Sequence, residues 1–539
     1  MKKLILTFSF FIVLLGTLQA SVSIIPMPQK CITKKGNFKV NDKTVITLSA
    51  DNEEMRNAVS FWNDLFTTAA GFTLEVSSTP RSSNVIRCRL NTSLPNEEAY
   101  QLKVSSSAIY IDARTPKGIF YAFQTLRQLL PSAIESDKRV TEQVQWTIPC
   151  VTIEDAPAFS YRGVMLDVSR HFIPKEDMKR HIDLLAFHKL NILHWHLTDD
   201  QGWRIEIKKY PKLTSVGGYR KKTIEGYMWG KATEWDTKRY GGFYTQEDVK
   251  EVVAYAQKRF VEIIPEIEMP GHSVAALAAY PQFSCSGGPF EVEGRWGVFN
   301  DIYCTKESTF EFMQDILDEV VALFPSSYIH LGGDEAPRIR WKNCVHCQER
   351  MKQEHLTKEA ELQTYFINRI ENYLNVKGKK IIGWDEILEG GIPQRATVMS
   401  WRGEKGGIHA AKAGYDVIMS PNIYMYFNCF QSKTNGKKIG NPNRVITLEK
   451  AYNYHPVPET LTADEAKHIK GVQANLWTEY ISTLDEMEYM LYPRVAALSE
   501  VAWSKKESKD YEKFCTRLQG VQKHYDVLGV DYYQATVNE

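Results

Sequence analysis

Two adjacent carboxylates, Asp334 and Glu335, are the residues of this chain best suited to acid–base chemistry. They follow a short apolar run, residues 328–331, and two glycines that leave the backbone open to a ligand. Neighbouring acids repel each other and are costly to desolvate, which a fold seldom accepts without a chemical use. Adjacent strand residues point to opposite faces, so these two cannot flank one bond as paired catalytic carboxylates do. The pattern predicts two different tasks for one substrate, or one catalytic and one structural acid.

The elements that must position these acids begin at about residue 159. From there, apolar strand-like runs alternate with polar loops and helical runs. We count eight strand candidates: Arg162–Val168, Asn191–Leu197, Val261–Met269, Tyr328–Gly333, Lys380–Trp384, Thr397–Trp401, Asp416–Ser420 and Gly471–Trp477. Eight strands with interleaved helices predict an α/β fold, a (β/α)8 TIM barrel with insertions, whose active site forms at the C-terminal strand ends.

The regions around the barrel complete a division into four parts. Residues 1–20 combine two lysines, an apolar run and a small final residue, which predicts a signal peptide. Residues 21–157 mix strand-like and helical runs, which predicts a small α+β domain without evident catalytic residues. Residues 158–505 form the predicted catalytic barrel, and residues 506–539 a C-terminal helical segment that packs on it. We therefore expect an exported protein, periplasmic or secreted.

Composition argues against several kinds of partner. The 539 residues include 66 basic and 65 acidic ones, a net charge of +1, so we expect neither nucleic acid nor an anionic membrane as partner. No apolar run is long enough to span a bilayer comfortably. The 27 tyrosines and 12 tryptophans supply flat rings on which sugar faces stack. The oligomeric state does not follow from these features.

Histidine and cysteine spacings bear on metal binding. His194 and His196 share one face of a predicted strand, but the other strand ends supply mainly acids and tryptophans, so we expect buried, hydrogen-bonded histidines. Cys285 and Cys304 bracket a Gly-rich loop, which a disulfide could close in an oxidising compartment. Cys344-Val-His-Cys347 has the spacing of half a zinc site, but no second Cys-x-x-Cys follows. We therefore predict no metal and no cofactor.

Five motifs lie in order at the predicted strands. They are Arg162-Gly-Val-Met-Leu-Asp-Val-Ser-Arg-His171, His194-Trp-His-Leu-Thr-Asp-Asp-Gln-Gly-Trp-Arg204, Pro265-Glu-Ile-Glu-Met-Pro-Gly-His272, His330-Leu-Gly-Gly-Asp-Glu335 and Asn475-Leu-Trp-Thr-Glu479. Together they resemble glycoside hydrolase family 20, the β-N-acetylhexosaminidases. The resemblance runs from about Ile24 to Trp503 and includes the small N-terminal domain.

The resemblance implies a retaining, substrate-assisted mechanism, in which the substrate's own 2-acetamido oxygen attacks the anomeric carbon and an oxazolinium intermediate forms. By this resemblance, Glu335 is the general acid and then the base that activates water. Asp334 holds the acetamido N–H and stabilises the developing positive charge, and Tyr426 orients the acetamido oxygen. Asp199 and His272 form a buried network that tunes Glu335, whose pKa should be raised so that it stays protonated.

The resemblance also implies sugar-binding residues. Arg162 offers a rigid fork of donors to O3 and O4, and Glu479 accepts a hydrogen bond from O4. The aromatic walls of the pocket are Trp384, Trp401 and Trp477. One position departs from the family pattern, because Asn428 stands where most members have an aspartate that reaches O6. This leaves open which 6-position the site prefers, a 6-sulfate included.

The function predicted is therefore exo-acting hydrolysis of terminal GlcNAc or GalNAc from a glycan substrate. A chitinase-type barrel would show an Asp-x-x-Asp-x-Asp-x-Glu strand, which this chain lacks. The alternative from another class is a non-catalytic carbohydrate-binding barrel. It could keep Arg162 and the tryptophans, but it would have no use for Asp334, Glu335 and Tyr426 together. The sequence does not decide between GlcNAc and GalNAc, or which aglycone is accepted.

Overall fold

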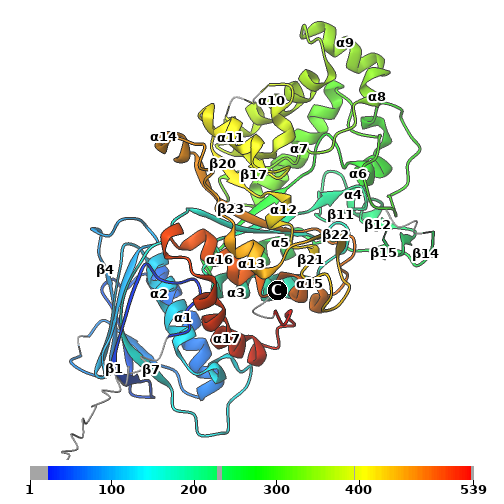
Figure 1. Ribbon diagram of the computed structural model, residues 1–539. Coiled ribbons are helices and arrows are strands. Elements are labelled where there is room, and N and C mark those ends of the chain that lie inside the picture. The colour runs from blue at the N-terminus through cyan, green and yellow to red at the C-terminus, as the bar shows by residue number, and fades with distance from the viewer. Residues whose placement is uncertain (1–21, 80, 228–232, 392, 394, 536–539) are drawn as a thin grey trace, which may run out of the picture.

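The computed structural model describes residues 22–79, 81–227, 233–391, 393 and 395–535. Figure 1 shows a smaller N-terminal domain built on one sheet, in blue and cyan, beside a larger domain that holds the rest of the chain. The predicted signal peptide lies outside the described residues. Within them, no helix is both long enough and apolar enough to cross a membrane.

The N-terminal domain is a seven-stranded sheet with two helices packed on one face (Figure 1). Its strands run in the order β1-β7-β5-β6-β4-β2-β3. Their bounds are β1 (Lys30–Lys39), β2 (Val45–Leu48), β3 (Glu75–Ser77), β4 (Val85–Leu90), β5 (Tyr100–Val104), β6 (Ala108–Ala113) and β7 (Thr147–Asp155), and the helices are α1 (Glu53–Leu65) and α2 (Pro116–Leu129). Along β5, buried and exposed residues alternate, as expected for a strand with one covered face.

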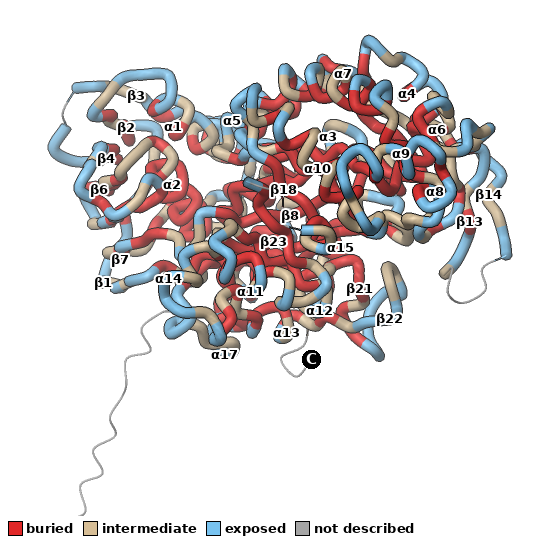
Figure 2. Tube along the Cα trace, turned by 90° about the horizontal axis from the view of Figure 1, so that it is seen from above, coloured by how far each residue is buried: buried red, intermediate tan, exposed pale blue. Residues whose placement is uncertain are grey.

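The larger domain is a closed barrel of eight parallel strands, in the order β16-β17-β18-β19-β20-β23-β8-β9. The strands are β8 (Tyr161–Asp167), β9 (Ile192–His196), β16 (Glu262–Glu266), β17 (Tyr328–His330), β18 (Lys380–Trp384), β19 (Thr397–Ser400), β20 (Val417–Met419) and β23 (Ile469–Leu476). All eight predicted strands are present, so the predicted fold class is confirmed. Figure 2 shows that most of their residues are buried, because helices cover the barrel from outside.

Long helices follow most barrel strands. They are α3 (Lys175–Phe187), α5 (Gln246–Gln257), α7 (Glu307–Leu323), α10 (Glu359–Val376), α11 (Lys405–Lys412) and α16 (Arg494–Trp503). The start of α5 is fixed by a capping box: Thr245 accepts a hydrogen bond from the backbone N–H of Asp248, whose side chain bonds back to the backbone of Thr245.

Shorter elements fill the connections between the barrel strands and helices. After β9 come β10 (Thr198–Asp199), β11 (Gly202–Trp203), α4 (Lys212–Ser215), β12 (Tyr219–Arg220), β13 (Thr223–Ile224), β14 (Trp235–Asp236) and β15 (Tyr240–Gly241). After β16 come α6 (Val274–Ala279) and the 3-10 turn η4 (Pro281–Phe283), and after β17 come α8 (Ile339–Lys342) and α9 (Val345–Gln353). Later connections hold α12 (Asn422–Met425), β21 (Cys429–Phe430), β22 (Asn441–Val445), α13 (Leu448–Asn453), α14 (Ala463–Ala466) and α15 (Leu484–Leu491).

The C-terminal helix, α17 (Tyr511–Leu528), contacts both domains. Arg517 pairs with Glu500 of the barrel helix α16 at 2.6 Å. Farther along α17, His524 lies 2.9 Å from Glu135 of the N-terminal domain. The helix therefore packs on the barrel and also contacts the N-terminal domain, a contact that the sequence did not predict.

Candidate active site

A pocket of about 380 Å³ lies at the C-terminal ends of the barrel strands. Six of the residues that line it are Asp334, Glu335, Trp401, Tyr426, Trp477 and Glu479. They come from the segments that follow β17, β19, β20 and β23, so four strands contribute to one cavity. The position agrees with the rule that barrel enzymes place reactive groups at this end.

The loop after β17 is shaped by glycines. Gly332 has a φ of +67°, and a Cβ atom there would lie 1.7 Å from the carboxylate of Glu268. That carboxylate instead accepts a hydrogen bond of 2.9 Å from the backbone N–H of Gly333. The chain then continues through Asp334 to Glu335, which has a φ of +43°. Only glycine fits beside Glu268, so the glycines allow the turn that presents the two acids.

The two adjacent acids differ in exposure. The side chain of Asp334 is 11% exposed, whereas that of Glu335 is 42% exposed. Asp334 is therefore enclosed by protein, while Glu335 faces the open part of the pocket. This difference fits two separate tasks for the pair.

His272 lies between the acid pair and a second pair of buried carboxylates. Its Nδ1 atom is 3.0 Å from Asp200 and 3.3 Å from Asp199. Its Nε2 atom is 3.6 Å from Glu335 and 3.8 Å from Asp334. Burial lowers the pKa of His272, but the surrounding carboxylates, Asp199 first, raise it well above the usual value. His272 is therefore positively charged beside the catalytic candidates.

This charge overturns the predicted pKa of Glu335. Burial raises the pKa of Glu335, but contact with His272 and the charge of Arg170 outweigh it, and the pKa lies below its usual value. For Asp334, burial dominates and raises the pKa to about 6, with the charge of Glu335 adding to it while His272 opposes it. In the free protein the acid with the raised pKa is therefore Asp334, and the prediction for Glu335 was wrong.

The predicted sugar-binding role of Arg162 was also wrong. Arg162 lies near the N-terminal end of β8, fully buried, and its guanidinium donates to Glu98 of the N-terminal domain at 2.8 and 2.9 Å. Arg170, three residues beyond the C-terminal end of the same strand, does line the pocket, as does Arg444 of β22. Arg170 pairs with Asp199 at 2.8 Å and lies 5.0 Å from the ring centre of Trp477.

Aromatic rings form one side of the pocket. The rings of Trp401 and Tyr426 are stacked, with centres 5.9 Å apart and an angle of 14° between their planes. The ring centre of Trp477 lies 6.3 Å from that of Tyr426 and 5.9 Å from that of Trp384. Trp384 is almost fully buried, and its indole N–H donates to Glu266. Trp401 and Trp477 therefore border the cavity, and Trp384 lies behind Trp477.

Three polar residues line the pocket with a buried oxygen that lacks a partner within the described part of the chain. They are Asp334, through Oδ1, Asn428, through Oδ1, and Glu479, through Oε2. Burial raises the pKa of Glu479, although the charge of Arg170 opposes this. Buried polar atoms are nearly always hydrogen-bonded in native proteins. These three atoms are thus positioned to bond a polar ligand.

The histidines under the pocket are buried and hydrogen-bonded, as predicted. Glu266 lies at the centre, 3.0 Å from His194 and 3.0 Å from His330. His196 contacts Glu266 on one side and Asp199, at 2.9 Å, on the other. These contacts link the barrel interior to the acids around His272.

Comparisons with known proteins identify the family of this chain. The family model for glycosyl hydrolase family 20, catalytic domain, matches residues 159–506, and the model for domain 2 of that family matches residues 21–156. The chain belongs to glycosyl hydrolase family 20. This family 20 chain is 46% identical over 517 residues to a beta-hexosaminidase of Porphyromonas gingivalis, an alignment that covers 95% of the chain and 64% of that relative's length.

Solved structures resemble this family 20 chain over nearly its whole length. The GH20 beta-N-acetylhexosaminidase from Streptomyces coelicolor A3(2) matches with a TM-score of 0.83 and 31% identity, covering 96% of this chain and 98% of that one. The GH20 exo beta-N-acetylglucosaminidase from Vibrio harveyi, in complex with N-acetylglucosamine, matches with a TM-score of 0.84 and 34% identity. That match covers 95% of this chain and 78% of the Vibrio chain.

Arg170 and Asp200 are among the residues of this family 20 site that were not selected from the sequence. Arg170 could have been found from strand direction, because it follows the C-terminal end of β8 whereas Arg162 lies near its beginning. Asp200 adjoins the predicted Asp199, and no spacing rule distinguishes which carboxylate is closer to His272. The distances show that both contact the imidazole.

Proposed function

We propose that this family 20 chain is an exo-acting β-N-acetylhexosaminidase that removes terminal GlcNAc or GalNAc from glycans with retention of configuration. The observation that carries the proposal is the pair Asp334 and Glu335 on one loop, with Tyr426 in the same pocket. An acid pair on adjacent residues suits a mechanism in which the substrate supplies the nucleophile. The names of the relatives support the same activity.

In the proposed reaction, Glu335 protonates the leaving oxygen and then takes a proton from the attacking water. A bound sugar covers this partly exposed carboxyl, and the resulting desolvation moves its pKa upward, toward the value an acid needs. His272 positions Glu335 and holds a positive charge beside it. That charge favours the carboxylate that forms when the proton has left.

Asp334 acts on the acetamido group. As a carboxylate it accepts a hydrogen bond from the acetamido N–H and stabilises the positive charge of the oxazolinium ion. The hydroxyl of Tyr426 donates to the acetamido oxygen and holds it in line with the anomeric carbon. Trp401 and Trp477 border the space for the sugar ring, and Glu479 and Arg170 bind its hydroxyls.

Hydrolysis of chromogenic substrates tests the activity. The purified protein should cleave β-GlcNAc or β-GalNAc substrates and leave a β-glucoside untouched, because the glucoside lacks the acetamido nucleophile. NMR of the first product should show retention. An inverted product, or equal cleavage of the β-glucoside, would exclude acetamido participation. Failure on every substrate would favour the non-catalytic carbohydrate-binding alternative.

Two variants separate the roles of the acids. Glu335→Gln removes the proton donor, so substrates with good leaving groups should retain the most activity. Asp334→Asn weakens acetamido participation for every leaving group, with an expected loss of about 10²–10⁴-fold. The same leaving-group dependence in both variants would contradict this division of roles.

We also propose that the site tolerates 6-sulfated GlcNAc. Asn428 is a neutral amide on the pocket wall, and Arg444 lines the same cavity. An aspartate at this position would repel a sulfate by about 4 kcal/mol at 4 Å and an effective dielectric constant of about 20. The lysines considered nearby contribute less, since Lys437 pairs with Asp531 and Lys438 donates to the carbonyl of Lys433.

Comparing 6-sulfated and plain β-GlcNAc substrates tests this preference. Asn428→Asp should lower kcat/KM for the sulfated substrate much more than for the plain one. An equal effect on the two substrates would show that charge at residue 428 does not determine specificity.

The protein is further proposed to be exported, to the periplasm or the medium. The support is the pattern of residues 1–20, with a basic start, an apolar run and a small final residue. Cell fractionation and N-terminal sequencing of the mature protein test it. A cytoplasmic protein with an intact N-terminus would refute export.

A further inference from the structure

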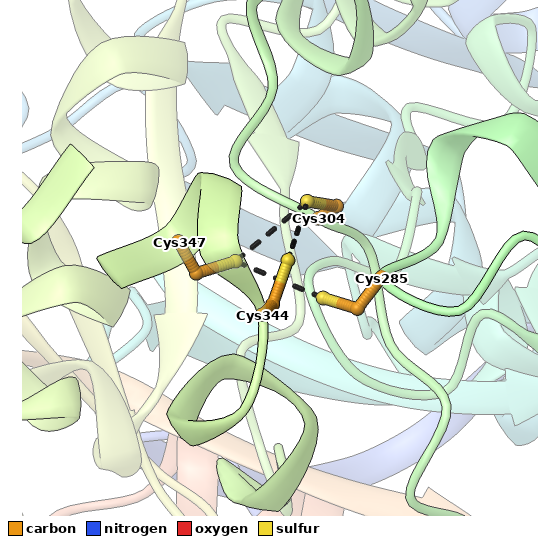
Figure 3. Close-up of side chains that lie close together, drawn as sticks. All are labelled: Cys285, Cys304, Cys344 and Cys347. Carbon is orange, nitrogen blue, oxygen red and sulfur yellow. Dashed lines mark hydrogen bonds between the residues drawn. The ribbon is translucent and has the colours of Figure 1, made fainter. Parts of the chain in front are cut away.

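Four cysteines meet at one point outside the candidate active site (Figure 3). The sulfur atoms of Cys285, Cys304, Cys344 and Cys347 all lie within 4.8 Å of one another. Cys304 is 3.6 Å from Cys344 and 3.6 Å from Cys347, and Cys347 is 3.7 Å from Cys285. Figure 3 shows the four side chains pointing toward a common centre.

The cysteines come from the segments that follow two neighbouring barrel strands, β16 and β17. Cys285 and Cys304 stand at the two ends of a loop whose base is closed by a bridge between Ser284 and Tyr303. Cys344 is the residue before α9, and Cys347 lies in the first turn of that helix. The cluster therefore joins the segment after β16 to the segment that follows the catalytic candidate Glu335.

The geometry fits a single tetrahedral metal ion. Zinc–sulfur bonds of about 2.3 Å place the four sulfurs of a tetrahedral site about 3.8 Å apart. The three sulfur–sulfur distances of 3.6–3.7 Å are close to this value. A disulfide needs about 2.05 Å, and here Cys304 and Cys347 each have two sulfur neighbours at almost equal distance, so no pairing into disulfides is favoured.

The surroundings also suit a structural metal. Cys304, Cys344 and Cys347 are buried and Cys285 is partly buried. They form a small core of their own with apolar neighbours, among them Ile302, Trp341, Met351 and Leu362. Four thiols gain little from each other in such a core, whereas a bound Zn²⁺ ion takes them as thiolate ligands, releases their four protons to solvent and offsets half of their negative charge. Cysteine thiolates in a closed tetrahedral set are the usual ligands of structural zinc.

We propose that Cys285, Cys304, Cys344 and Cys347 bind one structural Zn²⁺ ion, which fastens α8 and α9 to the loop after β16. All four positions are filled by protein, so the ion has no open site for a substrate. The sequence-based argument against zinc assumed that a second Cys-x-x-Cys was required. The structure supplies the second pair from two residues that are distant in the chain but adjacent at the base of one loop.

Metal analysis of the purified full-length protein tests the proposal. Protein purified without added metal or chelator should contain about one zinc per chain. Cys285→Ser should lose most of it, while Cys285→His should retain zinc, because Cys₃His sets also bind it. Cys31→Ser is the matched control, since Cys31 is also partly buried but lies outside the cluster, and it should retain full zinc.

Thiol titration of the wild type gives a result that does not depend on the folding of any variant. In denaturant without reductant, a chelator should release the zinc and make all four cluster thiols reactive. Four thiols that react only after reduction would show two disulfides and overturn the proposal. Reactive thiols without any metal, or one iron in place of zinc, would overturn it equally.

Discussion

Replacing Arg162 with methionine should destabilise the protein and leave substrate binding unchanged. Arg162 is fully buried and donates to both oxygens of Glu98 and to the carbonyls of Phe159 and Lys189, at 2.8 to 3.0 Å. Glu98 is itself 7% exposed, and it also pairs with Lys117 at 2.7 Å. Methionine fills most of the volume but leaves the carboxylate of Glu98 with only the lysine as an ionic partner.

The magnitude follows from this pairing. Breaking a buried ion pair costs about 3–5 kcal/mol, and because Lys117 remains we expect about 3 kcal/mol. Unfolding entropy of about 2.1 cal/mol/K per residue converts this into a drop in Tm of about 3 °C if the whole chain unfolds together. The drop becomes about 10 °C if the N-terminal domain unfolds as a separate unit.

The ion pair between Arg162 and Glu98 also predicts how the stability of the protein depends on pH. Burial raises the pKa of Glu98, but Arg162 and then Lys117 lower it to about 2. A depressed carboxyl pKa contributes stability that is present above the ordinary value of 4.5 and is lost as the pH falls toward 2. The wild type should therefore lose stability between about pH 4.5 and pH 2, and Arg162→Met should show a smaller loss over that range.

Calorimetry and steady-state kinetics on the same samples distinguish a structural role of Arg162 from a role in substrate binding. Arg162→Met should lower Tm with KM unchanged, and adding Glu98→Gln should recover part of the loss, because no buried charge is then left unpaired. Arg170→Met should raise KM and should also lower Tm, because Arg170 lines the pocket and forms a buried ion pair with Asp199. If Arg162→Met instead raised KM at unchanged Tm, the arginine would bind substrate and the structural assignment would be refuted.

The remaining predictions concern the pocket. The pKa of Asp334 is about 6, so its carboxylate is protonated as the pH falls through that value. The value of kcat/KM should therefore decrease below about pH 6. Asp334→Asn should remove this acidic decrease from the pH profile. Gly332→Ala should lower Tm far more than the control Gly378→Ala. Gly378 has a similar φ to Gly332, but it has open space where a Cβ atom would lie. Equal losses of Tm in the two variants would refute the clash with Glu268. Tyr426→Phe should lower kcat by about 10²-fold, measured at saturating substrate, and an unchanged kcat would exclude the hydroxyl from the reaction.

The sequence by itself determined the barrel and the position of its active end. Apolar runs of strand length, separated by helical periodicity, are local signals, and all eight were found where they were predicted. The acid pair was identifiable because Asp334 and Glu335 directly follow such a run and two glycines. These inferences needed only neighbouring residues, since strand direction and barrel topology then bring the strand ends together.

Only the tertiary structure decided which arginine of the first motif lines the pocket, which acid has the raised pKa and what the cysteines form. Arg162 and Arg170 belong to one motif, but a seven-residue strand separates the ends at which they lie. The pKa order of Asp334 and Glu335 depends on His272, which arrives from the loop after another strand. The four cysteines come from three separate segments of the chain. Each of these properties depends on distances between residues remote in sequence, and local spacing does not encode such distances.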